Sequence, residues 1–430
     1  MKPYWAAAAL VVSFTALAQT APPLPSAPPE SVGMSSQRLA RISAALKKEV
    51  ADGSFRGAVV MVARKGKLVY QDAVGMQTAD APMRPDTVFR IYSMTKPLVS
   101  VAAMILVEDG RIQLTDPVGK FLQGFDKMQV SVASKAAEGT AYNMVAAERP
   151  MTVQDLLRHT AGLAYGEITQ NAPVKEGLEK AGVYRKDLDY EARGMTASEQ
   201  VERLVKVPLA FHPGTTWHYS LASDVLGRVI EAASGKRLGE FLQERLFRPL
   251  RMRDTGFSVP QAKMARLAEP LETDRFSGRP NKLIDVSAPP ANDSGGAGAV
   301  STAGDYLRFS QMLLNGGALD GARVMSRTTV RLMTSDHLGN FINQPQQPGE
   351  LLLGTKGYTF GLGFAVRQGD GVGGVPGSAG EFMWAGYAGT YFFVDPKEQL
   401  TAVLMTQAPS PNRAYFRRML KQLVYQSIVD

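Results

Sequence analysis

Apolar residues recur along the chain with two periods, and these predict which segments are helices and which are strands. Between Ser35 and Asp52 the apolar positions have a helical spacing, and Gly53 ends the pattern. Residues 57–75 contain two runs rich in β-branched residues around Arg64-Lys65-Gly66, which predicts two strands joined by a turn. From Lys96 to Asp109 the chain is almost entirely apolar, so we expect a helix that is buried on every side.

Strand patterns return near the end of the chain. Four segments are predicted as strands: 358–367, 380–386, 390–396 and 399–407. Asp395-Pro396-Lys397-Glu398 predicts a hairpin turn between the last two. A final helix is expected after them, with these residues on one face: Tyr415, Met419, Leu423 and Val424. The middle of the chain is instead helix-like and rich in polar residues.

Together these elements predict an α/β fold of the α+β type. An antiparallel sheet is assembled from both ends of the chain, flanked by the N- and C-terminal helices, and a mainly helical lobe is inserted into it. We assign residues 35–127 and 291–430 to the sheet lobe and residues 128–290 to the helical lobe. A binding site is expected where two such lobes meet.

The first residues have the pattern of a targeting segment. A short basic start, an uncharged apolar run and Ala16-Leu17-Ala18 predict a signal peptide over residues 1–18, with an uncleaved anchor as the alternative. The prolines of residues 19–34 predict an extended spacer without a core. A lipid anchor is excluded because the chain has no cysteine, and no second apolar run could span a membrane. We therefore expect a bacterial protein that is exported, periplasmic or secreted, without stable membrane insertion.

Composition narrows the possible partners. The chain is 45% hydrophobic and 20% charged, which suits a large buried core, and its net charge is +8. Its basic residues are scattered among apolar and acidic neighbours, so we expect solvated faces and no nucleic-acid partner. The absence of cysteine excludes thiol catalysis. The 4 histidines lack the spacing of a metal site, and no glycine loop predicts a nucleotide site, so neither a metal nor a cofactor is expected.

The candidate chemistry begins at Ser93-Met94-Thr95-Lys96. Pro97 fits only the first turn of a helix, so the helix should begin near Ser93 and hold Lys96 one turn above it. A serine hydroxyl becomes a nucleophile when a base takes its proton, and a lysine in a dry cleft can be that base. The alternative is that Ser93 is only the N-cap of the helix.

Further stretches occur in a fixed order around this motif: "FRIYSMTK", "LVEDGRIQLTDPV", "LLRHTAGL", "HPGTTWHYSLASDVLG", "GGAGAVSTAGDYLRF" and "EFMWAGYAGTYFFVDP". Together they resemble the serine β-lactamase-like and penicillin-binding superfamily, and look closest to its class C-like carboxylesterases, the family VIII esterases. The resemblance covers about residues 30–428. It implies the β-lactamase/transpeptidase-like fold and chemistry through an acyl-enzyme.

The resemblance also implies roles for individual residues. Ser93 would be the acylated nucleophile and Lys96 its partner. Tyr219 matches the tyrosine of the Y-x-N element, and would pass a proton to the leaving group and back. The alternative for Tyr219 is an aromatic residue that packs beside Trp217.

A third element is Trp384-Ala385-Gly386, which matches the W-x-G of the esterase branch. The resemblance implies that the backbone N–H groups of Ser93 and Tyr387 form an oxyanion hole. Gly386 would let the substrate approach the strand closely, and Trp384 would contact the substrate. The alternative for Trp384 is a tryptophan buried in the strand.

Two departures from the lactamase pattern favour an esterase. Leu221 replaces the asparagine of Y-x-N, and Trp384 replaces the residue that helps to hold a β-lactam carboxylate. Both changes favour neutral, apolar acyl groups. We therefore predict a serine carboxylesterase for small-molecule esters with short acyl chains. A class C-like β-lactamase, a DD-peptidase, an acyltransferase and a penicillin-binding-like receptor remain as alternatives.

Other loci carry weaker signals. Gly354-Thr355-Lys356-Gly357 resembles a displaced K-x-G but is interpreted as a loop. Gly377-Ser378-Ala379-Gly380 lacks the strand–turn–helix context of a nucleophile elbow. His159 is expected to order a loop, and Gly295–Gly298 are expected to form the tight return from the helical lobe.

Overall fold

The computed structural model describes residues 23–136, 139–183 and 193–430. The predicted signal peptide, residues 1–18, lies outside the described residues. None of the helices in the described ranges combines the length and the apolar character needed to cross a bilayer.

The central element is an antiparallel sheet assembled from both ends of the chain, as predicted, and it has seven strands. Its strands, in spatial order, are β2 (Lys67–Gly75), β1 (Gly57–Arg64), β13 (Leu400–Thr406), β12 (Tyr391–Asp395), β11 (Phe382–Ala385), β10 (Ala365–Arg367) and β9 (Tyr358–Phe360). The pairing of β1 with β13 joins the two ends of the chain. Every residue of these two strands is buried, because helices cover both faces of the sheet.

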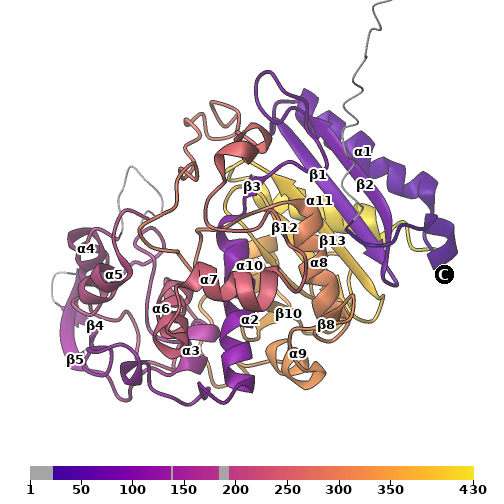
Figure 1. Ribbon diagram of the computed structural model, residues 1–430. Coiled ribbons are helices and arrows are strands. Elements are labelled where there is room, and N and C mark those ends of the chain that lie inside the picture. The colour runs from indigo at the N-terminus through magenta and orange to yellow at the C-terminus, as the bar shows by residue number, and fades with distance from the viewer. Residues whose placement is uncertain (1–22, 137–138, 184–192) are drawn as a thin grey trace, which may run out of the picture.

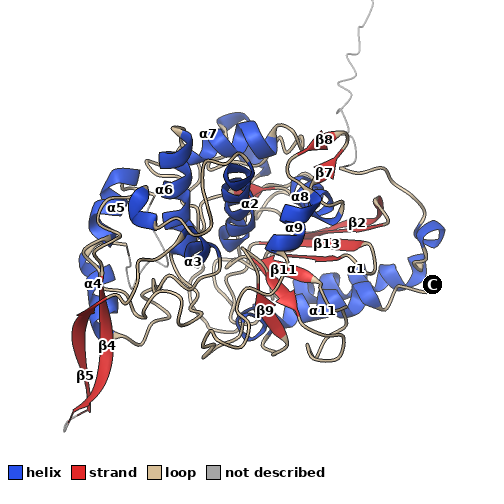
Figure 2. Cartoon of the chain, turned by 90° about the horizontal axis from the view of Figure 1, so that it is seen from below, coloured by secondary structure: helices blue, strands red, loops and turns tan. Residues whose placement is uncertain are grey.

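Figure 2 shows the layers. Helices α1 (Ser36–Ala51) and α11 (Arg413–Tyr425) pack on one face, and α8 (Ala303–Leu314) packs on the other. The hydroxyl of Ser35 caps α1 by accepting from the N–H of Arg38, which explains why the helix begins there. The predicted helix at this position and the predicted turn at Arg64-Lys65-Gly66 are confirmed, with Lys65 and Gly66 both at positive φ.

The segment from 358 to 367 differs from the prediction of one strand. It forms two short strands, β9 and β10, that pair with each other. The chain reverses between them, with the N–H of Gly361 donating to the carbonyl of Phe364 and Gly363 at φ 97°. Glycine permits this turn because it has no Cβ. The late part of the sheet therefore has five strands instead of four.

The middle of the chain is mostly helical, but it also contains a hairpin that no pattern predicted. Its helices are α3 (Val153–Leu157), α4 (Ala172–Lys180), α5 (Ala197–Leu204), α6 (Ala222–Ser234) and α7 (Leu238–Leu242). The hairpin of β4 (Gln129–Ala136) and β5 (Gly139–Ala146) projects from this part in Figure 2. Its small and polar side chains hide the apolar alternation of a half-buried strand, so the sequence signal is weak. The predicted lobe limits stay a prediction.

The remaining elements are short. They are β3 (Phe89–Arg90), β6 (Val300–Ser301), β7 (Ala318–Leu319), β8 (Ala322–Arg323), α9 (Arg327–Met333), α10 (Pro348–Leu353), 3₁₀ turns at Pro29–Val32, Tyr92–Met94, Val118–Lys120 and Gln261–Arg266, and a π-helical turn at Gln243–Phe247.

Helix α2 (Thr95–Glu108) runs between the helical part and the sheet part of the molecule (Figure 1). All residues from Thr95 to Leu106 are buried, so the prediction of a helix buried on every side is confirmed. It packs on α6 and ends before Gly110, which has φ 71°. Because α2 is enclosed, the position of its N-terminal end is fixed.

The expectation of a spacer without a core is wrong for residues 23–34. Leu24 and Met34 are buried, and the carbonyl of Pro25 and the N–H of Ala27 bond to the backbone of Leu68 in β2. This segment therefore covers part of the outer edge of the sheet, where unpaired backbone groups would otherwise be exposed.

The predicted face of α11 is also displaced. Tyr415 is 41% exposed, whereas Phe416, Leu420 and Val424 form the buried stripe. The polar residues Arg417 and Lys421 are buried on the same helix, because carbonyl groups and the carboxylate of Glu381 meet them inside the protein.

Candidate active site

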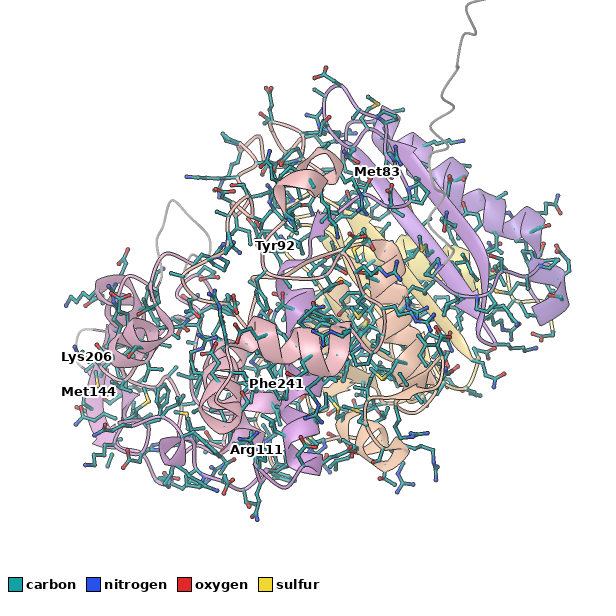
Figure 3. The ribbon with its side chains drawn as sticks, in the orientation of Figure 1. Met83, Tyr92, Arg111, Met144, Lys206 and Phe241 are labelled. Atoms are coloured by element: carbon teal, nitrogen blue, oxygen red, sulfur yellow. The ribbon has the colours of Figure 1, made fainter. Side chains whose placement is uncertain are left out.

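Ser93 lies in the 3₁₀ turn Tyr92–Met94 that leads into α2. The N-cap residue of the 3₁₀ turn is Ile91, and the N-cap residue of α2 is Met94. Neither element has a hydrogen bond to a capping side chain, so the N-cap alternative for Ser93 is wrong. Tyr92 has φ 44°, a conformation that costs free energy for a non-glycine residue and is common beside functional groups. Figure 3 shows Tyr92 at the N-terminal end of α2, between the two parts of the molecule.

Lys96 follows Ser93 by one turn and is 1% exposed. Its Nζ donates to the carbonyl of Gly296 at 2.7 Å, to the hydroxyl of Tyr165 at 3.0 Å and to Oγ of Ser93 at 3.3 Å. These three bonds hold the amine next to the serine, at the spacing that the sequence predicted. A proton can therefore move between Ser93 and Lys96 without rearrangement of the helix.

Tyr219 comes from the helical part and meets Ser93 from the other side. Its hydroxyl lies 2.7 Å from Oγ of Ser93, and the centre of its ring lies 4.7 Å from Nζ of Lys96. The ring packs on Tyr165 and on Trp384, at centroid distances of 5.3 and 5.5 Å. Tyr219 is therefore more than an aromatic packing residue, because its hydroxyl reaches the candidate nucleophile.

His159 orders the segment that carries Tyr219. Its ring lies 5.1 Å from the ring of Tyr219, and its Nδ1 is 3.2 Å from the hydroxyl of Ser220. Its carbonyl accepts from the N–H of His218. Burial lowers the pKa of His159 well below its ordinary value, and the Lys96 cation lowers it further. The imidazole is therefore neutral at pH 7.

This burial predicts a pH dependence of stability. Below pH about 6.5 the unfolded chain takes up a proton on His159, whereas the folded protein excludes this proton. The contribution of the neutral His159 to stability is therefore fully present above that pH. It is lost progressively as the pH falls towards the lower pKa of the folded state. Each excluded proton contributes a slope of about 1.4 kcal/mol per pH unit. We expect His159→Gln to have a smaller loss of unfolding free energy than the wild type between pH 7.5 and 5.

Urea denaturation of both proteins at the two pH values measures this difference. Groups that do not interact with His159 contribute equally to both proteins, among them Asp305, whose pKa is raised to about 6 by burial. Equal pH slopes for the two proteins would contradict the prediction.

Three site residues were missed by the sequence interpretation. Tyr165 and Gly296 bind Lys96, and Asp224 of α6 holds Gly296 by accepting from its N–H at 3.1 Å. A Cβ on Gly296 would overlap the carboxylate of Asp224, so glycine is required there. The glycine-rich stretch was the available signal, but it was interpreted only as a turn.

The stretch Trp384-Ala385-Gly386 ends β11 beside Ser93. A Cβ on Gly386 would overlap the carbonyl of Ile91, two residues before Ser93, so only glycine lets the strand lie this close. Trp384 is 1% exposed and packs behind Tyr219, and its contact with substrate stays a prediction. The oxyanion pair of Ser93 and Tyr387 also stays a prediction, although the rings of Tyr92 and Tyr387 lie 5.4 Å apart and bring the two segments together.

A family model for β-lactamase matches residues 42–426 of the chain. The chain belongs to the β-lactamase family. It is a serine hydrolase of this family, which agrees with the resemblance and the fold predicted from the sequence.

The relatives of the chain include an uncharacterized protein, an esterase and a hydrolase with acyltransferase activity. An uncharacterized protein of Mycobacterium tuberculosis is 35% identical over 84% of this chain and 88% of its own length. Esterase EstB of Burkholderia gladioli is 31% identical over 85% of this chain and 90% of its own length. Among solved structures, EstCE1, a hydrolase with promiscuous acyltransferase activity, is 27% identical with a TM-score of 0.73, and the match covers 90% of this chain and 99% of that one.

The other loci lie away from the Ser93 group. Lys356 is exposed in the loop between α10 and β9, and Ser378 is buried in the loop before β11, where its N–H donates to Asp395. In the parts of the chain that the structure describes, no three potential metal ligands gather at one place.

Proposed function

We propose that the protein is a serine carboxylesterase that hydrolyses small esters with short apolar acyl groups through an acyl-enzyme on Ser93. The observation that carries the proposal is the position of Ser93 Oγ, 2.7 Å from the hydroxyl of Tyr219 and 3.3 Å from Nζ of Lys96. A nucleophile held between two proton-transfer groups is the arrangement that acyl transfer to serine needs.

The reaction follows from these contacts. Oγ of Ser93 attacks the ester carbonyl while its proton passes to the Tyr219/Lys96 pair, and the oxyanion forms against the N–H groups of Ser93 and Tyr387. Collapse of the tetrahedral intermediate breaks the bond to the alcohol oxygen, which takes the proton from Tyr219. Water then attacks the acyl-enzyme with the same groups as base and acid, and releases the carboxylic acid and free Ser93.

The surroundings of the site support an ester over a β-lactam substrate. Leu221, at the position of the lactamase asparagine, is 2% exposed and offers no polar side-chain group. The neighbours of three site residues pack in one apolar cluster: the buried Tyr92 next to Ser93, the buried Ala297 next to Gly296, and the partly buried Tyr387 next to Gly386. Apolar groups beside the site suit an uncharged, apolar substrate. The name of the relative EstB, an esterase, supports the same reading.

A direct comparison of two substrates tests the proposal. We expect kcat/KM on p-nitrophenyl butyrate to exceed that on nitrocefin by at least about 100-fold. Loss of the bond to the carboxylate weakens β-lactam binding by about 1.5–3 kcal/mol, and loss of the asparagine by about 0.5–1.5 kcal/mol more. Initial rates are measured for the wild type and for Ser93→Ala as the blank. Faster nitrocefin hydrolysis would place the protein with the lactamases and contradict the assignment.

Transfer of the acyl group to an alcohol is the second candidate. The same acyl-enzyme serves both reactions, and the relative EstCE1 is described as a hydrolase with promiscuous acyltransferase activity. With a p-nitrophenyl ester and added methanol, the ratio of methyl ester to free acid separates the two outcomes. Methyl ester as the main product at low methanol would make the protein an acyltransferase.

A further inference from the structure

Two arginines of α11 bind the backbone of the Gly386–Tyr387 segment. Arg417 Nη2 donates to the carbonyl of Gly386 at 2.8 Å, and Arg413 Nη1 donates to the carbonyl of Tyr387 at 2.9 Å. The Arg413 guanidinium also lies 4.7 Å from the centre of the Tyr387 ring. Both peptide carbonyls on this segment therefore face the C-terminal helix.

Arg417 is an unusual buried cation. It is 4% exposed, and its other terminal nitrogen donates to the carbonyl of Leu352 at 3.0 Å. Within the described residues no carboxylate pairs with it, and its Nε has no hydrogen-bond partner. Burial lowers its pKa, and the neighbouring Arg413 cation lowers it further. A buried guanidinium without a counter-ion is costly, and such groups concentrate at functional sites.

The geometry of the peptide group sets the direction of the Tyr387 N–H. In a trans peptide the C=O and the N–H point in opposite directions. Because the carbonyl of Gly386 points to Arg417, the N–H of Tyr387 points away from α11. Ile91 lies directly against Gly386, because its carbonyl would overlap a Cβ placed there, and Ser93 follows Ile91 by two residues.

We propose that Arg417 is a positioning residue for the oxyanion hole, which aims and polarises the Gly386–Tyr387 peptide so that its N–H binds the developing negative charge. This inference rests on the proposed acyl-enzyme chemistry at Ser93. A charged donor on the carbonyl makes the N–H of the same peptide a stronger donor, because hydrogen bonds in a chain polarise one another. The buried positive charge of Arg417 also stabilises the developing oxyanion directly, since the protein interior screens the charge only weakly.

The test compares Arg417→Met with Arg417→Lys and with Arg418→Met. Arg418 is a matched control because it donates from the same helix to the carbonyl of Leu353, next to the Leu352 carbonyl that Arg417 also binds. Rates on p-nitrophenyl butyrate are expressed per active site, titrated with a fluorophosphonate. We expect Arg417→Met to lower kcat about 10–100-fold with little change in KM, less than the loss of a direct oxyanion donor. Arg417→Lys should restore part of the loss, and Arg418→Met should stay within about twofold of the wild type.

The affinity of butylboronic acid provides a second measurement. Oγ of Ser93 adds to the boron atom and loses its proton, and the tetrahedral adduct places a boron-bound oxygen in the oxyanion hole. We expect Arg417→Met to weaken this binding by the same factor as kcat. Unchanged boronate affinity in Arg417→Met would overturn the proposal. An equal loss of kcat in Arg418→Met would also overturn it, as would a lower rate in Arg417→Met that is explained entirely by fewer titrated active sites. If the wild type lacks esterase activity, the proposed function fails, but the boronate comparison still decides the role of Arg417.

Discussion

Replacing Ser93 with alanine will abolish ester turnover and leave the fold intact. The change removes Oγ, the atom proposed to form the acyl-enzyme, so we expect kcat on p-nitrophenyl butyrate to fall by about 10⁵–10⁶-fold, as for nucleophiles of other serine hydrolases. Ser93 is partly exposed at the start of α2, and its hydroxyl caps neither helix, so stability should change little. Initial rates and thermal unfolding of the two proteins measure both effects.

Ser378→Ala provides the control for this variant. Ser378 belongs to the other serine motif in the sequence, but its side chain lies buried in the loop before β11. We expect this variant to keep its rate within about twofold of the wild type. Turnover by Ser93→Ala above a tenth of the wild-type rate would contradict the assignment of the nucleophile. A burst of one product per wild-type molecule without steady turnover would indicate a penicillin-binding-like receptor.

The part of the site that depends on local spacing could be predicted from the sequence. Ser93 and Lys96 are three residues apart at the start of one helix, so helix geometry alone brings them together. The other partners of Lys96 are 69 and 200 residues away along the chain, at Tyr165 and Gly296. No local pattern encodes such contacts, because they depend on how the segment between α3 and α4, which carries Tyr165, and the glycine-rich loop, which carries Gly296, pack against α2. Tyr219 was found through the resemblance to a family and not through spacing.

In the fold, too, features set by local sequence could be predicted, and features set by contacts between distant residues could not. The two strands that join the ends of the chain, β1 and β13, were predictable because their runs are mostly apolar and buried throughout. The buried face of α11 was not, because Arg417 and Lys421 look like solvent-exposed residues in the sequence. Nζ of Lys421 in fact bonds to the buried carboxylate of Glu381 at 2.5 Å. A buried ion pair is recognisable only when both partners can be placed, and here Glu381 lies in the loop just before β11 while Lys421 lies in α11, 40 residues further along the chain.

Removing the hydroxyl of Tyr219 is expected to have the second largest effect on turnover. In Tyr219→Phe the ring keeps its packing on Trp384 and Tyr165, but the 2.7 Å hydrogen bond to Oγ of Ser93 is lost. The alcohol then leaves without a positioned acid, so we expect kcat on unsubstituted phenyl butyrate, whose leaving group is only weakly acidic, to fall by about 10²–10⁴-fold, the usual contribution of general acid–base catalysis. The loss should be smaller for esters of more acidic alcohols, since these need less protonation as they leave.

Tyr165→Phe separates proton transfer from the support of Lys96. Its hydroxyl accepts from Nζ of Lys96 at 3.0 Å, as a second tyrosine beside the same amine. We expect this variant to lose no more than about tenfold in kcat, because Lys96 keeps its bonds to Gly296 and Ser93. Rates on a series of phenyl butyrates with leaving groups of different acidity give the decisive comparison. If Tyr219→Phe and Tyr165→Phe lose equally, or if neither loss depends on the leaving group, Tyr219 supports the structure of the site and Lys96 alone moves the proton.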